Sequence, residues 1–295
     1  MVGLILEGGG MRAGFVAGAV MALMDRGIVN FDAAIAVSAS VPTLAYFAAG
    51  QREEMEQVWR KELSTPKFVC YRNIPSATLT LSTKRPVLDI DYLVFDVFEK
   101  KYPVNRQRLL TGRTACRFAV TKTDGGSLAF LNPEEHDIYQ AFKAAMAVPG
   151  AYPGTVCVDN CEYVDGGTVN PLPAGSLFDQ GASKVLAVLS KPLDCENEPP
   201  SFLERTILWR YFHRYDWMLE KLWEAAQGYN EQVSLLEKMA RRNPPAAYLV
   251  SPDRTPPAAF ITRDSRKINR TVDMGYRKVK DLEAEIRMFV KEDVG

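Results

Sequence analysis

Three short segments of the chain hold residues that together could carry out acyl transfer. They are Glu7-Gly8-Gly9-Gly10-Met11-Arg12-Ala13, Ala36-Val37-Ser38-Ala39-Ser40 and Asp165-Gly166-Gly167. Such chemistry needs a nucleophile, a base that activates it, and N–H groups that stabilise a developing oxyanion. Each segment alone is weak evidence. All three follow predicted strands, however, and their combination favours a serine hydrolase.

Ser38 is the candidate nucleophile because it lies between an apolar strand and a helix. A sharp strand-to-helix turn exposes the hydroxyl above the sheet and lets the next backbone N–H, that of Ala39, face the oxyanion. The crowded positions two residues before and after favour glycine, but Ala36 and Ser40 stand there, so the match to G-x-S-x-G is degenerate. Taken alone, this segment is more typical of a helix N-cap than of a nucleophile.

The loop Gly8-Gly9-Gly10 joins the first strand to the first helix. Three glycines allow the backbone to approach a ligand closely and to turn several N–H groups toward it. Arg12 adds a cation beside the loop, although a solvated helix start explains it equally well. The loop suits an oxyanion or a phosphate, but it is neither a P-loop nor a clean G-x-G-x-x-G, so a nucleotide site is the weaker alternative.

Asp165 is the candidate base, because the chain has only two histidines. His136 precedes Asp165, and His213 lies in a segment that is typical of an amphipathic helix. We therefore favour a site without a triad, in which Asp165 takes the serine proton directly. Gly166 and Gly167 provide a permissive turn after it, and the alternative interpretation is an ordinary Asp-Gly turn.

The elements that must position these residues alternate between buried strands and helices, which predicts an α/β fold with a parallel sheet. Strands are expected over 2–6, 33–37, 117–121, 128–131, 162–164, 184–189 and 248–250. Helices are expected over 15–24, 40–49, 53–62, 89–101, 138–148, 202–226, 229–242 and 268–290.

The composition is that of a globular protein, with 295 residues, 47% hydrophobic and 24% charged. Lys+Arg and Asp+Glu balance at 36 each, so the charge gives no drive toward nucleic acid. We see no signal peptide and no apolar run of about 18 residues, and five cysteines are typical of reduced thiols, so we expect a cytoplasmic protein. Cys157 and Cys161 suggest a metal only weakly, and we expect neither metal nor cofactor.

The three segments, in this order, resemble the patatin-like phospholipase family. The family pattern is a D/E-G-G-G-x-R-G loop, then G-x-S-x-G, then D-G-G/A. The segments 144–149 and 165–173 also resemble the family's small-residue helix ending in proline and its turn after the aspartate. The resemblance covers about residues 2–190. The tail resembles, less securely, a bacterial subgroup with a helical C-terminal extension.

The resemblance implies a three-layer α/β/α sandwich with a mainly parallel central sheet. It implies lipid acyl hydrolysis by a Ser-Asp dyad, with Ser38 as nucleophile and Asp165 as base. An oxyanion hole is then expected in the loop formed by Gly8, Gly9, Gly10, Met11 and Arg12. We expect residues 1–191 to form the catalytic core and 192–295 a mainly helical extension packed on it.

The sequence departs from the family pattern at Ala13, Ala36 and Ser40, where glycine is usual. A side chain at Ser40 could tilt the turn, and a displacement of about 1 Å costs on the order of a hundredfold in rate. The alternative function is therefore a degenerate member that binds acyl lipid or a partner without efficient hydrolysis.

The expected substrate is a lipid or another fatty-acyl ester, and the sequence leaves the oligomeric state open. Residues 202–223 carry several tryptophans among basic side chains, including Trp217 and Trp223. Such a helix could dock at a membrane surface. We favour the simpler alternative, in which the helix packs on the body of the protein.

Overall fold

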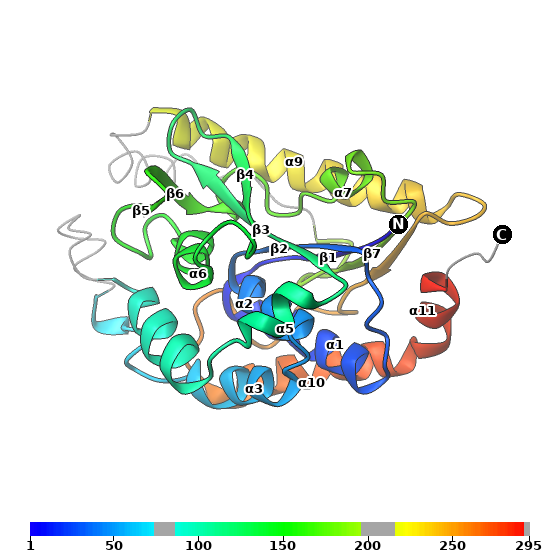
Figure 1. The fold of residues 1–295 in the computed structure, drawn as a ribbon, viewed down its shortest axis with the longest axis horizontal. Coiled ribbons are helices and arrows are strands. Elements are labelled where there is room, and N and C mark those ends of the chain that lie inside the picture. The colour runs from blue at the N-terminus through cyan, green and yellow to red at the C-terminus, as the bar shows by residue number, and fades with distance from the viewer. Residues whose placement is uncertain (74–85, 196–215, 292–295) are drawn as a thin grey trace.

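The computed structural model describes residues 1–73, 86–195 and 216–291. An eight-stranded sheet runs through the middle of the molecule (Figure 1). Its parallel part has the order β3-β2-β1-β7-β8, and its antiparallel part is made by β4, β5 and β6. The bounds are β1 Val2–Leu6, β2 Ala33–Val37, β3 Ala115–Lys122, β4 Leu128–Leu131, β5 Val156–Val158, β6 Cys161–Asp165, β7 Lys184–Val188 and β8 Ala247–Val250.

Helices cover both faces of this sheet, which confirms the predicted α/β/α sandwich (Figure 1). The central strand β1 shows why: all of its residues are buried, and alternate side chains enter two different cores. Leu4 and Leu6 pack in the larger core and Ile5 in the smaller one. The α-helices are α1 Gly14–Asp25, α2 Val41–Ala48, α3 Arg52–Gln57, α5 Arg106–Thr111, α6 Ile138–Met146, α7 Gly175–Asp179, α9 Asp216–Ala240, α10 Ser265–Asp281 and α11 Glu283–Val290.

Strand register brings the ends of β2 and β6 together. Phe118 and Ala119 of β3 pair with both β2 and β4, so those two strands lie on opposite edges of β3. Val120 and Thr121 pair with both β4 and β6, so β6 lies on the same edge as β2. The two strands approach from opposite directions, and the residues that follow them therefore meet above β3.

Helix α10 packs directly on α1 through two glycines. A Cβ at Gly18 would lie 1.9 Å from the carbonyl oxygen of Val272, and a Cβ at Gly275 would lie 1.8 Å from that of Phe15. The helix backbones touch only because these side chains are missing.

The expected division of the chain at residue 191 stays a proposal. Strand β8 and helix α10, which follow that residue, both contact the part of the chain before it.

The predicted strands are all present, whereas several helix boundaries differ. The break expected after residue 226 is wrong, since α9 runs through Gly228 without interruption, and residues 202–215 lie outside the described part of the chain. The single helix expected over 268–290 is divided between α10 and α11. Helix α3 continues into a π-helical segment, Val58–Glu62. The segment Tyr92–Lys101 is π-helical over its whole length. The short elements β5, α5 and α7 escaped prediction because none spans two turns or an alternating pattern.

Candidate active site

Ser38 stands at a strained turn directly after β2. Its φ of 55° lies in the left-handed region, which a residue with a side chain adopts only when its surroundings hold it there. Gly8 belongs to these surroundings, because a Cβ there would lie 2.8 Å from Ser38 Cβ and 2.9 Å from the carbonyl oxygen of Val37. The glycine-rich loop after β1 is thus packed against the turn after β2, and the strain supports a functional rather than a capping role for Ser38.

Ser40 is accommodated without displacing the turn. Its side chain is fully buried, and its Oγ donates a hydrogen bond of 2.6 Å to the carbonyl oxygen of Glu7. Ala36 is also fully buried in the larger core. The side chain at position 40 therefore joins the Ser38 turn to the glycine-rich loop. The sequence had suggested instead that this side chain could tilt the turn.

Two N–H groups of the glycine-rich loop are engaged by the protein itself. The N–H of Met11 donates to the carbonyl oxygen of Phe260 (3.1 Å), and that of Arg12 donates to Gly9 (3.2 Å). Within the described chain, no acceptor is recorded for the N–H groups of Gly9 and Gly10. Both glycines have positive φ, 136° and 58°. The N–H of Gly8 likewise has no backbone acceptor among the described residues, so the N–H groups of all three glycines are available to a ligand.

Asp165 is held beside Ser38 from several sides. Its N–H donates to Ala147, the residue after α6, and its carbonyl accepts from the Thr121 hydroxyl. Carboxylate Oδ1 accepts a 2.7 Å bond from the N–H of Gly167. Gly166 lets the turn close over β3, since a Cβ there would lie 2.5 Å from backbone atoms of Ala119.

The carboxylate of Asp165 lies close enough to the Ser38 hydroxyl for that hydroxyl to lower its pKa. Its second oxygen, Oδ2, is buried and has no hydrogen-bond partner among the described residues. Burial raises the pKa of Asp165 to about 6, and the Ser38 hydroxyl and the Gly167 N–H offset this only partly. At neutral pH the group is a carboxylate that can still accept a proton readily.

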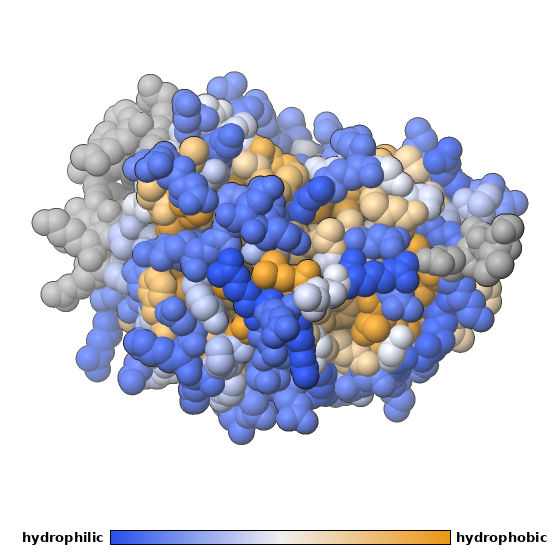
Figure 2. All heavy atoms as spheres, in the orientation of Figure 1, coloured by the Kyte–Doolittle hydropathy of each residue, from blue (hydrophilic) through white to orange (hydrophobic). Residues whose placement is uncertain are grey.

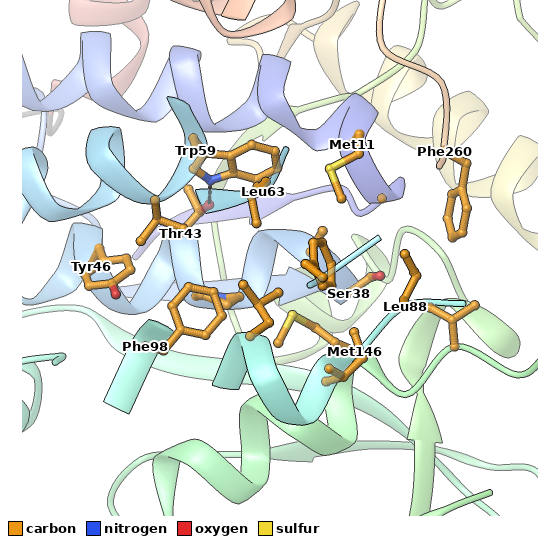
Figure 3. Close-up of a pocket in the computed structure, with 18 residues that line it drawn as sticks. Met11, Ser38, Thr43, Tyr46, Trp59, Leu63, Leu88, Phe98, Met146 and Phe260 are labelled. Carbon is orange, nitrogen blue, oxygen red and sulfur yellow. Dashed lines mark hydrogen bonds between the residues drawn. The ribbon is translucent and has the colours of Figure 1, made fainter. Parts of the chain in front are cut away.

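An apolar pocket opens from Ser38 toward the helices around α2 (Figure 3). Tyr46 and Phe98 lie at one end and Phe260 at the other, with Ser38 nearer to Phe260. No charged side chain of the described residues lines it. Away from Ser38, polar atoms of its wall are bonded within the protein: Trp59 Nε1 donates to Thr43 Oγ1 (3.0 Å), and the Tyr46 hydroxyl donates to the carbonyl oxygen of Tyr102. This surface suits a hydrocarbon chain.

A second, polar pocket meets the first at Ser38. Both are lined by Ser38, Val148 and Phe260. The polar pocket is also lined by Gly8, Gly9, Asp165, Gly167 and four further polar or charged residues, namely Glu7, Arg12, Thr168 and Lys191. Every charged side chain that lines either pocket is in this second one.

Sequence reasoning missed Ser190 and Lys191. A signal for them existed, because they follow the predicted strand that becomes β7, next to β1 in the sheet. Ligands of parallel sheets bind beyond the carboxyl ends of the strands, where polar residues after neighbouring strands converge. The same rule brings Glu7, Ser38 and Lys191 to one edge.

The remaining candidate groups lie elsewhere. His136 lines neither pocket and contacts Asn132, while His213 falls outside the described residues. Among residues 1–73, 86–195 and 216–291 there is no group of three or more His, Cys, Asp or Glu side chains placed to hold a metal. The helices in the same ranges include none that is both long and apolar enough to cross a bilayer.

Comparisons with known proteins agree with this architecture. The crystal structure of VipD from Legionella pneumophila superposes with a TM-score of 0.52 at 14% identity, covering 96% of this chain and 66% of VipD. The uncharacterized protein YjjU of Escherichia coli K12 is 23% identical over 210 residues, which are 68% of this chain and 55% of YjjU. This chain thus spans about half the length of that relative.

The family profile described as Patatin-like phospholipase matches residues 4–178, more than half of the chain. The match includes the glycine-rich loop, the Ser38 turn and Asp165, the three segments that meet at the junction of the two pockets. The chain belongs to the patatin-like phospholipase family.

Proposed function

We propose that the protein hydrolyses fatty-acyl esters of lipids with a Ser38–Asp165 dyad. The observation that carries this proposal is the meeting of β2 and β6 on one edge of β3, which sets the strained Ser38 beside a buried carboxylate. The base of such a dyad must be a carboxylate at neutral pH and must gain a proton as the serine attacks. The raised pKa of Asp165, about 6, fits both requirements.

The reaction proceeds in two steps. Asp165 Oδ2 takes the hydroxyl proton while Ser38 Oγ attacks the ester carbonyl, and the carbonyl oxygen becomes an oxyanion facing the N–H groups of Gly9 and Gly10. Collapse breaks the bond to the alcohol oxygen, which leaves with the proton from Asp165. A water molecule then gives a proton to Asp165 and attacks the acyl-enzyme. Collapse breaks the bond between the acyl carbon and Ser38 Oγ, which takes the proton back from Asp165, and the fatty acid is released.

The apolar pocket receives the acyl chain in this scheme. It begins at Ser38 and is lined by hydrocarbon and aromatic side chains, so the chain gains about 25 cal/mol for each Å² removed from water. The alcohol part of the ester then extends into the polar pocket.

Contact with a membrane surface is a further part of the proposal. Trp217 does not contact the membrane in it, because its Nε1 donates to the Thr123 carbonyl oxygen and its ring packs on Gly126. Trp223 is 37% exposed, next to Leu222 of the polar pocket. The one face drawn in Figure 2 is mostly hydrophilic, with separate apolar areas between polar side chains. Trp223→Ala should weaken liposome binding, and unchanged binding would remove this part.

The decisive experiment is labelling of the purified protein with a fluorophosphonate, which reacts only with an activated serine. We expect labelling of the wild type, none of Ser38→Ala, and strongly reduced labelling of Asp165→Asn. Ser40→Ala serves as the matched control, since it alters a neighbouring serine hydroxyl. A folded wild type that is not labelled would overturn the proposal and favour lipid binding without hydrolysis.

A further inference from the structure

Two buried side chains of opposite charge in the polar pocket have no part in the proposed reaction. Glu7 and Lys191 are only 3% and 7% exposed, and both line this pocket. They lie on the loops that follow β1 and β7, which are adjacent in the sheet. Charged groups are costly to bury even when they are paired, so the presence of these two calls for an explanation.

The side chain of Glu7 ties the loop after β1 to the loop after β7. Its Oε2 accepts a 2.6 Å hydrogen bond from the N–H of Ser190. Its backbone is held as well, since its N–H donates to Val188 (3.0 Å) and its carbonyl oxygen accepts from Ser40 Oγ (2.6 Å). Glu7 is therefore fixed on several sides, immediately before the three glycines of the glycine-rich loop.

Ser190 in turn lies against the middle of the glycine-rich loop. It is fully buried, and a Cβ at Gly9 would lie 2.7 Å from Ser190 Oγ and 3.4 Å from Ser190 Cβ. Gly9 has a φ of 136°, but a glycine adopts many other conformations unless its neighbours restrain it. Contact with Ser190 therefore restricts the peptide groups of Gly9 and Gly10, whose N–H groups face the oxyanion in the proposed reaction.

Lys191 is placed to keep the carboxylate of Glu7 charged. Burial raises the pKa of Glu7, and the positive charge of Lys191 is the largest influence that opposes this rise. Lys191 Nζ is itself held 3.7 Å from the centroid of the Tyr229 ring on helix α9. Among the described residues, the titratable groups beside Glu7 are Arg12 on its own loop, Lys191 after β7 and Tyr229 on α9.

We infer that Glu7 and Lys191 are positioning residues for the glycine-rich loop. The carboxylate of Glu7 holds Ser190 against Gly9, and Lys191 keeps that carboxylate ionised. The inference rests on the proposed function, because it gives these two side chains a role in orienting the N–H groups that would stabilise the oxyanion. Ser190 and Lys191 follow residues 4–178, the part of the chain that matches the family profile, so this support comes from outside the matched segment.

The first test is hydrolysis of a short p-nitrophenyl ester by Glu7→Gln. The amide keeps the size of the side chain and an oxygen for the Ser190 N–H, but it has no charge. Because the loop acts mainly in the transition state, kcat should fall about tenfold to a hundredfold while KM changes little.

A second buried Glu–Lys pair provides the matched control for this substitution. Glu62 is 9% exposed, its Oε1 lies 2.7 Å from Lys101 Nζ, and neither residue lines a pocket of the site. Glu62→Gln should leave kcat unchanged, even if it lowers the stability of the fold.

The pH profile of kcat distinguishes positioning from a purely structural role. Lys191→Met removes the cation that favours the ionised form of Glu7, so the pKa of Glu7 should rise. The loss of kcat relative to the wild type should then be about tenfold larger at pH 6.5 than at pH 8.5. Lys191→Arg keeps the cation and should retain the profile of the wild type.

The double variant Glu7→Gln with Lys191→Met covers the case in which Lys191→Met alone does not fold, because it removes both charges together. If Lys191 acts through Glu7, this protein should have the same kcat as Glu7→Gln alone and no added pH dependence. A further fall in the double variant, wild-type kcat in Glu7→Gln, or a Lys191→Met loss that is equal at both pH values would overturn the inference. A wild type that hydrolyses no ester would remove the proposed function and this inference with it, whereas an active wild type with unaffected variants removes the inference alone.

Discussion

The two pockets that meet at Ser38 differ in nearly every physical property. The apolar pocket has hydrocarbon walls, and the polar atoms of Trp59, Thr43 and Tyr46, which lie away from Ser38, are bonded within the protein. The polar pocket holds all the charged side chains of the site, and one buried N–H of Arg12 has no acceptor among the described residues. The apolar pocket is thus complete without a ligand, whereas the polar pocket has hydrogen-bonding capacity in reserve. The difference indicates that the apolar pocket provides affinity for a ligand, whereas the polar pocket provides the groups that select the ligand and react with it.

The largest effect should come from Asp165→Asn, on the polar side of the junction. The amide keeps the acceptor for the Gly167 N–H but cannot take the serine proton, so we expect turnover of a short p-nitrophenyl ester to fall about a thousandfold or more. In the wild type, kcat/KM should fall below about pH 6, where Asp165 becomes protonated. A variant that retains wild-type turnover would contradict the dyad.

The same substitution should stabilise the fold at neutral pH. A raised carboxylate pKa means that the folded state binds more protons than the unfolded state between about pH 4 and 6, so wild-type stability falls as pH rises through that window. Asp165→Asn removes this loss, which is on the order of 2–3 kcal/mol at most. Urea unfolding of both proteins at pH 5 and pH 7.5 measures it, with Asp179→Asn, far from both pockets, as the control.

The second-largest effect is expected from Gly8→Ala, in the polar pocket against the Ser38 turn. The new methyl group would lie 2.8 Å from Ser38 Cβ, so the strained turn must shift. We expect turnover to fall about a hundredfold with every acyl chain, because the displacement acts on the nucleophile. Gly27→Ala provides a control at a glycine with open space around it, although its positive φ makes that change mildly destabilising. A fall confined to long chains would show that the apolar pocket, and not Ser38, had changed.

Leu93→Phe tests the apolar pocket alone. Leu93 is 3% exposed and lines that pocket only, so a larger side chain should shorten the space for a hydrocarbon. We expect kcat/KM for a dodecanoyl ester to fall about tenfold relative to a butanoyl ester. Leu93→Met conserves the volume and should change the ratio little. An equal fall in this ratio with Leu93→Met would contradict the assignment of the pocket to the acyl chain.

The smallest effect is expected from Ser40→Ala. Loss of the Oγ–H bond to Glu7 leaves a buried carbonyl without that donor and should cost about 1 kcal/mol of stability. Turnover should fall only severalfold, because the turn itself remains. Increased turnover would show that the side chain at position 40 hinders the site, as the departure from glycine first suggested.

The positions of the strands along the chain were predictable because their apolar runs are short and bounded by glycine or polar residues. The meeting of Ser38 with Asp165 followed from the resemblance, whereas its geometric cause, the shared edge of β3, depends on a register that no local pattern contains. Helix α9 shows a case in which a local signal misleads. Gly228 lowers helix propensity and predicts a break, but packing against the sheet keeps the helix continuous.

The loop residues show a second limit of sequence reasoning. The sequence treated Met11 as one of the oxyanion donors, but a carbonyl nearly 250 residues away accepts its N–H. Ser40 was treated as an obstacle, yet its hydroxyl finds an acceptor on Glu7. In both cases the outcome depends on a partner distant in sequence, and hydrogen bonds of this kind are decided only by the assembled fold.

The contact of Phe260 with the glycine-rich loop has a consequence for the order of events during synthesis. A Cβ at Gly10 would lie 2.3 Å from the Phe260 carbonyl oxygen, so the loop is fitted to a segment made long after it. While the ribosome is still translating the middle of the chain, the loop and the Ser38 turn exist without this support. We therefore expect the proposed activity to be absent from the nascent chain until residue 260 has left the ribosome and docked on the loop.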